Sequence, residues 1–180
     1  DLALIGIEDV KMQLTQEFPQ MVWTPRIRFA GLLDVPDKLG ETRSQGPVAG
    51  LAIDLLSDAN IETELLNLNK ALVRGRLPQA SDEILIGDQF AKSLALEINQ
   101  TATLIASTMY GSLTTANFKV VGTIRFGISA MDRGAMIVDL TGIQGSDSVS
   151  IAGATGNYDT KQVGTGKTVS VAGLSLTGAD

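Results

Sequence analysis

The chain has 180 residues, and its 14 basic and 20 acidic side chains give a net charge of −6. This acidic balance disfavours nucleic acid as a partner, because nucleic-acid binders need a basic patch. The sequence contains no histidine and no cysteine, which excludes the usual zinc ligands, disulfides, and catalysis by Ser-His-Asp or Cys-His groups. Because it has no apolar run long enough to cross a bilayer, we expect no membrane-spanning segment.

The N-terminal part predicts one helix and two strands. Apolar residues recur every three or four positions over residues 7–18, and Pro19 ends this helical pattern. Residues 21–33 and 47–53 predict strands. Residues 34–46 hold turn residues and several charges, and they predict the loop that joins the two strands.

The central part alternates helical and strand patterns. Helical spacing predicts a helix over residues 61–73, and a short apolar run at residues 84–86 predicts a buried strand. Asp88 is placed to cap a helix whose apolar face carries Phe90 and Leu94.

Three further strands are predicted, over residues 101–106, 118–124 and 135–138. Asp139 is placed to cap a helix after the last of them. These patterns predict an α+β fold, with a mixed sheet, packed helices, a small β-rich subdomain and a short β-rich C-terminal tail. We expect one core made of Ile84, Leu85, Ile86, Phe90, Leu94, Val120 and Ile124.

Five segments carry a resemblance to a known family, and in order they read RGRLP, EILIGDQFAKSLAL, TATLIA, FKVVGTI and AMIVDL. They occupy residues 74–78, 83–96, 101–106, 118–124 and 135–140. This order is similar to that of the extracytoplasmic domain of ABC transporter permeases of the macrolide-exporter and lipoprotein-releasing type. The closing half of that domain is missing after Val138.

The resemblance implies a non-catalytic periplasmic domain that couples membrane-helix motion to contact with a cargo or carrier protein, in lipoprotein release or efflux. Its implied partners are an ABC ATPase subunit, a second permease copy and a periplasmic carrier or cargo protein. Its implied location is the periplasmic or extracellular face of a bacterial inner membrane. The ATPase chemistry would lie on a separate subunit, so we expect no enzyme activity, catalytic residue, cofactor or metal in this chain.

Residues 145–180 differ in character, since they are rich in Gly, Ser and Thr and alternate apolar with hydroxyl side chains. This alternation predicts antiparallel strands joined by turns. Residues 158–180 resemble the second half of a repeat of filamentous-haemagglutinin-like bacterial surface proteins. We therefore expect a permease-type domain over residues 1–144 and a β tail over residues 145–180. The tail is either an independent unit or supplies strands that complete the first domain.

The candidate partner-binding site is the loop between the strands predicted over residues 101–106 and 118–124. It consists of Met109, Tyr110, Gly111, Ser112 and Leu113. In lipoprotein-releasing permeases the matching connection can extend into a hairpin that docks a carrier protein. An ordinary hairpin turn is the alternative.

Two other motifs have simpler explanations. Residues 164–168 read GTGKT, but Lys161 stands where a phosphate-binding loop needs its first glycine, so we expect a turn. The acidic residues Asp34, Asp37 and Glu41 lack the spacing of a calcium loop and are expected to be solvated. The alternative function, indicated by the tail, is a structural or adhesin-type bacterial surface module.

Overall fold

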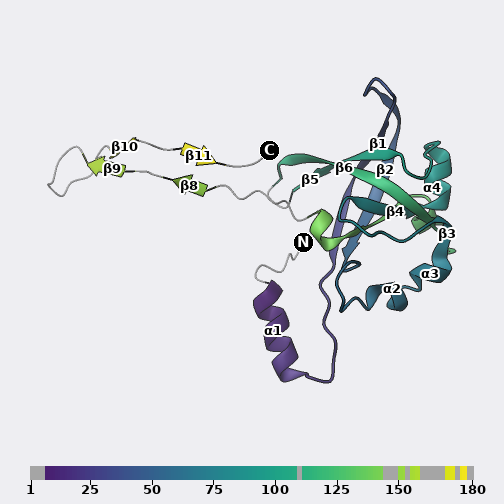
Figure 1. Cartoon of the computed structure of the whole chain (residues 1–180), viewed down its shortest axis with the longest axis horizontal. Coiled ribbons are helices and arrows are strands. Elements are labelled where there is room, and N and C mark those ends of the chain that lie inside the picture. Colours follow the sequence, from purple (N-terminus) through teal and green to yellow (C-terminus); the bar gives the residue numbers. More distant parts are fainter. Residues whose placement is uncertain are drawn as a thin grey trace. The chain divides into compact units, whose positions relative to one another are not determined.

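The structure is a computed structural model that describes residues 7–108, 111–143, 150–152, 155–158, 169–172 and 175–177. The chain divides into two compact units, Asp1–Gln144 and Gly145–Asp180. Figure 1 labels the elements of both units.

The first unit is built on a closed ring of six strands in the order β6-β4-β7-β2-β1-β5, and β5 pairs back with β6. A seventh strand, β3, pairs with β6 outside the ring. Neighbouring strands are parallel in the pairs β2–β7 and β4–β6 and antiparallel elsewhere. The strands are β1 (Ile27–Pro36), β2 (Thr42–Ile53), β3 (Leu72–Gly75), β4 (Glu83–Gly87), β5 (Thr101–Ser107), β6 (Leu113–Ile124) and β7 (Ala135–Asp139). Closure leaves the ring without a free edge.

The helices of this unit are short. They are α1 (Ile7–Glu17), α2 (Glu62–Leu65), α3 (Leu68–Ala71), α4 (Asp88–Ser93), α5 (Ser129–Asp132) and the 3₁₀ turn η1 (Leu140–Gly142). Helix α1 forms where the periodicity predicts it, but none of its side chains is buried. None of the helices in the described residues is long and apolar enough to cross a membrane.

The expected helix-packed α+β fold is wrong, because the first unit is mainly a β-barrel. The helix predicted over residues 61–73 is interrupted at Asn67, whose left-handed backbone (φ 50°) separates α2 from α3. The last residues of that predicted helix, Leu72 and Val73, belong to β3. The helical spacing of apolar residues therefore did not produce a continuous helix. The C-terminal residues of the predicted helix pair with β6 as a strand instead.

Side chains from β1, β2, β4, β5, β6 and β7 fill the main core together with α4. Within it, Phe90 and Leu94 of the α4 region lie against Gly46 of β2. Figure 1 shows α4 at one end of the strands. The helix thus covers one end of the barrel with apolar side chains.

The expectation of a single core is also wrong, because the core residues fall into two clusters. Ile84, Ile86 and Val120 lie in the main core, whereas Leu85 and Ile124 lie in a second cluster with Leu68 of α3 and Ile53 of β2. Adjacent residues of β4 point to opposite faces, as in any strand. A bulge between β4 and β6 pairs Ile84 with Val120 but Leu85 with Gly122. The extra residue in β6 moves the side chains that follow it to the opposite face of the sheet, so Ile124 lies in the second cluster.

The second unit contains four short strands: β8 (Ser150–Ala152), β9 (Thr155–Tyr158), β10 (Val169–Ala172) and β11 (Ser175–Thr177). Strand β8 pairs with β11 and β9 with β10, both antiparallel. Ala152 pairs with Ser175, and Thr155, three residues further on, pairs with Ala172, three residues back. The two ladders therefore continue the same residue register, and in the described residues they are two separate two-stranded sheets.

Truncation after Gln144 is expected to leave the stability of the first unit unchanged. The barrel closes through β5 and β6, so its ring uses no strand from residues 145–180. Thermal or denaturant unfolding of residues 1–144 and of the whole chain should give the same barrel transition. A loss of several kcal/mol on truncation would mean instead that the tail completes the fold.

Candidate functional site

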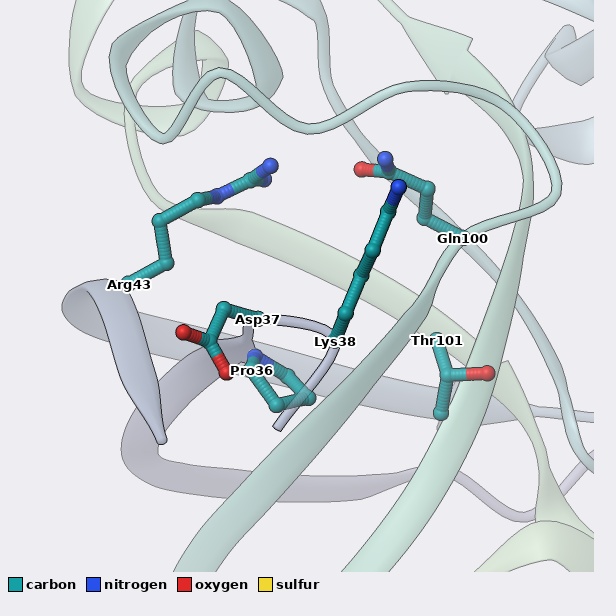
Figure 2. Close-up of a pocket in the computed structure, with 6 residues that line it drawn as sticks. All are labelled: Pro36, Asp37, Lys38, Arg43, Gln100 and Thr101. Atoms are coloured by element: carbon teal, nitrogen blue, oxygen red, sulfur yellow. The ribbon is translucent and has the colours of Figure 1, made fainter. Parts of the chain in front are cut away.

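The principal candidate site is a cavity of about 470 Å³, here called the hairpin cavity, beside the turn between β1 and β2. It is lined by Pro36, Asp37, Lys38, Arg43, Gln100 and Thr101 (Figure 2). Four of these residues come from the β1–β2 hairpin and two from the start of β5. Pairing of β1 with both β2 and β5 brings the two segments together.

The turn that forms one wall is held by Asp37. Its Oδ1 accepts hydrogen bonds from the backbone N–H groups of Leu39 (2.7 Å) and Glu41 (3.0 Å). The backbone N–H of Asp37 donates in turn to the carbonyl of Glu41 (2.8 Å). Strands β1 and β2 extend to Pro36 and Thr42 on either side. The loop predicted over residues 34–46 is therefore a much tighter turn, with Lys38 in the turn and Arg43 at the start of β2.

One hydrogen bond joins the β1–β2 hairpin to the segment that forms the opposite wall, and a second holds that segment itself. The guanidinium of Arg43 donates to the carbonyl of Ala95 at 2.8 Å, just after α4. The Oε1 of Gln100 accepts from the backbone N–H of Glu97 at 3.0 Å, which leaves the amide NH₂ of Gln100 as a donor. Figure 2 shows the head groups of Arg43, Lys38 and Gln100 on the same side of the cavity. The site therefore presents two cations and an amide to one region of space.

The buried carboxylates form a second set of candidates, and each is held by specific partners. Glu62 receives two hydrogen bonds from Arg26, at 2.9 and 2.7 Å. Asp132 accepts from the backbone N–H of Phe126 at 2.7 Å. Asp139 caps η1 by accepting from Thr141, as expected for its position. It also accepts from the N–H groups of Leu55 and Leu56. Such contacts fix the loops and strand ends that they join.

Asp88 does not have the role that its position predicts. The helix N-cap is Gly87, and no side chain caps α4. The buried carboxylate of Asp88 instead contacts Lys92 (2.8 Å), Arg74 (3.1 Å) and Thr123 (3.0 Å), with Arg125 at 3.3 Å. Burial alone would raise the pKa of Asp88, but hydrogen bonds from Lys92, Thr123 and Arg74 outweigh it and hold the pKa at about 2. This carboxylate joins β3, α4 and the end of β6.

Glu83 shows the same behaviour at the start of β4. Both oxygens accept from the guanidinium of Arg76, and Oε2 also accepts from the backbone N–H of Gln79 at 2.8 Å. The hydrogen bond from Arg76 is the main cause that lowers the pKa of Glu83 to about 2, against the opposing effect of burial. Glu83 and Asp88 are thus bound separately to cations and do not form a carboxylate pair.

The stability of the barrel should fall as the pH is lowered through the acidic range. The pKa values of Glu83 and Asp88 are about 2, below their ordinary values of 4.5 and 3.8. Their contribution is therefore complete above about pH 4.5 and is lost as the pH falls towards 2. Denaturant unfolding at several pH values measures this dependence. Glu83→Gln should flatten the slope between pH 5 and 2, whereas Glu8→Gln on the exposed α1 should leave it as steep. An unchanged slope in Glu83→Gln would contradict the assignment.

The candidate partner-binding loop lies between β5 and β6. Met109 and Tyr110 lie outside the described residues. Gly111 has a left-handed backbone (φ 83°), and Ser112 closes the turn by exchanging hydrogen bonds with Thr108. Leu113, the first residue of β6, is 75 % exposed. The geometry of the described part is that of a hairpin turn, and a docking role stays a prediction.

The remaining sequence motifs add no site. Residues 164–168 lie outside the described residues. Asp34 belongs to β1 and Asp37 holds the turn, so these two acids serve separate positions. Within residues 7–108, 111–143 and the described strands of the tail, no three His, Cys, Asp or Glu side chains gather to hold a metal ion.

The fold defines a closed, mixed β-barrel domain followed by a unit with two two-stranded antiparallel ladders. Against known families, residues 129–180 match the YDG domain. The matched segment begins at α5 and includes all four strands of the second unit. No curated protein matches the chain.

The match corrects the identity expected from the sequence. A YDG domain is not a permease extracytoplasmic domain, so the predicted ABC-permease identity is wrong, and with it the description as a transporter or membrane-protein domain. The implied transport role and its partners stay untested predictions.

The sequence did not identify the hairpin cavity. Lys38 and Arg43 stand in a segment that also holds Asp37 and Glu41, which reads as an ordinary solvated loop. Their partners Gln100 and Thr101 lie more than 50 residues away and join them only through the β1–β5 pairing. In the sequence, the signal for this site was the pair of basic residues, Lys38 and Arg43, on either side of the turn between two predicted strands.

Proposed function

We propose that this chain is a non-catalytic module of a bacterial surface protein, of structural or adhesin type, exposed on the extracellular side. The observation that carries the proposal is the architecture of the second unit. It consists of two antiparallel two-stranded ladders with a common register, in a segment that resembles a surface-protein repeat.

The two ladders favour a repetitive assembly for a physical reason. A two-stranded hairpin is marginally stable in water, because it cannot bury a sizeable apolar face alone. In the described residues β8–β11 form only two-stranded ladders, so each strand has one unpaired edge that another strand can use. Repeat proteins solve this problem by stacking neighbouring units, each of which completes the next.

The barrel supports a binding or structural role over a catalytic one. Glu62, Glu83, Asp88, Asp132 and Asp139 are the buried acids of the described residues, and each is engaged by backbone N–H groups, hydroxyls or basic side chains. A general acid or base needs a pKa near the working pH. Glu83 and Asp88, whose pKa values are about 2, would stay ionised instead.

The charge of the chain argues against a nucleic acid as its ligand. The net charge of −6 opposes approach to a phosphate backbone, and binding to DNA or RNA rests largely on neutralising that backbone. A small ligand or a protein surface is the better partner for an acidic domain of this kind.

Immunolabelling of cells that carry the gene tests the surface location. Antibodies raised against residues 1–144 should label intact cells as strongly as permeabilised ones. Labelling only after permeabilisation would contradict the proposal. Sequencing of the flanking reading frame gives a second test, since tandem copies of the pattern in residues 145–180 are expected beside it.

A further inference from the structure

We propose that the hairpin cavity binds a saccharide that carries a single negative oxyanion, a carboxylate or a sulfate ester. This inference rests on the proposed function, because it assigns a ligand to the surface module. The site is new in that neither the YDG match nor the sequence motifs point to it.

Lys38 and Arg43 leave cationic donors available in the hairpin cavity. Among the described residues neither Lys38 nor Arg43 forms an ion pair, although six such pairs occur elsewhere in the barrel. Arg43 donates from one nitrogen to the carbonyl of Ala95, which orients the guanidinium and leaves its other N–H groups as donors. An oriented guanidinium and an ammonium that line the same cavity suit an oxyanion, because charge-assisted hydrogen bonds are the strong ones.

The acid that lines the cavity, Asp37, is already engaged by backbone hydrogen bonds. Asp37 also lines the cavity, but its Oδ1 accepts two backbone hydrogen bonds, from Leu39 and Glu41. These N–H groups offset part of its negative charge. The two cations therefore outweigh the one carboxylate among the lining residues.

The volume of the cavity suits a small ligand. The cavity of about 470 Å³ lies within the ordinary range of small-molecule sites, about 300–1,000 Å³. The net charge of −6 repels a long polyanion but costs little for one negative group placed against Lys38 and Arg43. The balance of local and overall charge thus favours a small ligand with one charge.

The uncharged residues that line the cavity suit a saccharide as the carrier of that charge. The amide of Gln100 can exchange hydrogen bonds with sugar hydroxyls, and Thr101 lines the same β5 side of the cavity. The ring of Pro36 offers an apolar surface to the C–H face of a sugar. A free inorganic ion would use the cations alone and leave these groups without a role.

Titration of the full chain with methyl glucuronoside and with glucose 6-sulfate, followed by calorimetry or amide chemical shifts, tests the proposal. At least one of the two should bind, with shifts at Lys38, Arg43 and Gln100. Methyl glucoside, which lacks the charge, and acetate, which lacks the ring, should each bind at least tenfold more weakly. Which of the two charged sugars binds distinguishes a carboxylate from a sulfate.

Charge-removing variants connect binding to this cavity. Arg43→Gln and Lys38→Gln should each weaken binding about tenfold or more, since each removes a charge-assisted contact. Lys70→Gln removes an exposed charge on α3 and should leave binding unchanged. Lys38 and Arg43 are exposed, and an unchanged melting temperature verifies that their variants fold.

Absence of binding by both charged sugars would overturn the proposal. So would equal binding of methyl glucoside or acetate, or full binding by both cavity variants. These outcomes are independent of the cell-labelling test. A chain that labels intact cells but ignores both sugars would refute this ligand while leaving the surface-module function standing.

Discussion

Leu94→Ala is expected to lower the free energy of unfolding of the barrel by about 2–5 kcal/mol. Leu94 is 4 % exposed and lies in the main core, where its side chain and that of Phe90 meet β2 at Gly46. Truncation removes buried methyl groups and leaves a cavity at the end of the barrel. The surrounding ring is closed by strand pairing, so it has little freedom to collapse into that space.

Equilibrium denaturant unfolding of the wild type and the variant measures this loss. Leu39→Ala is the matched control, because Leu39 is 87 % exposed in the β1–β2 turn and its truncation should cost less than about 0.5 kcal/mol. A cost near zero for Leu94→Ala would mean that α4 does not cover the barrel end as described.

Gly87→Ala is expected to cost about 1–3 kcal/mol, although its backbone would accept any residue. Its φ of −57° is ordinary, so conformational strain is not the reason. A Cβ at this position would lie 2.3 Å from the carbonyl oxygen of Asp132, a backbone atom of α5. Relief requires moving α5 or the end of β4, and β4 is paired on both sides, with β6 and β7.

The control for this change is Gly134→Ala. A Cβ there would meet its nearest neighbour, the carbonyl oxygen of Pro47, at 3.4 Å, and its φ is not positive. Its unfolding free energy should stay within about 0.5 kcal/mol of the wild type. If both substitutions proved equally mild, the close approach of α5 to β4 would be wrong.

Local pattern was sufficient for most of the strands. The apolar run at residues 84–86 and the alternation at residues 101–106, 118–124 and 135–138 correspond to β4, β5, β6 and β7. Such patterns are reliable because a side chain's facing in a strand depends only on its position along the chain. The capping role of Asp139 followed in the same way, since it needs partners only two residues away.

Tertiary structure decided the architecture. Closure of the barrel depends on pairs such as Leu33 with Leu104 and Ala49 with Ala135, which join distant segments and leave no local signal. The bulge that sends Ile124 to the second cluster exists only where β6 meets β4. Asp88 reads as a helix cap from its neighbours, yet its carboxylate pairs with Arg74 of β3 as well as with Lys92, one turn further along α4.

The candidate site was decided at the same level. By itself the sequence established an acidic chain without histidine or cysteine, with strands in most of the right places and a hydroxyl-rich β tail. It did not place Arg43 beside Gln100, because that proximity arises when β1 pairs with β2 on one side and β5 on the other. The cavity forms only when these strands pair, and the packing of the whole core, rather than any one segment, determines which strands pair.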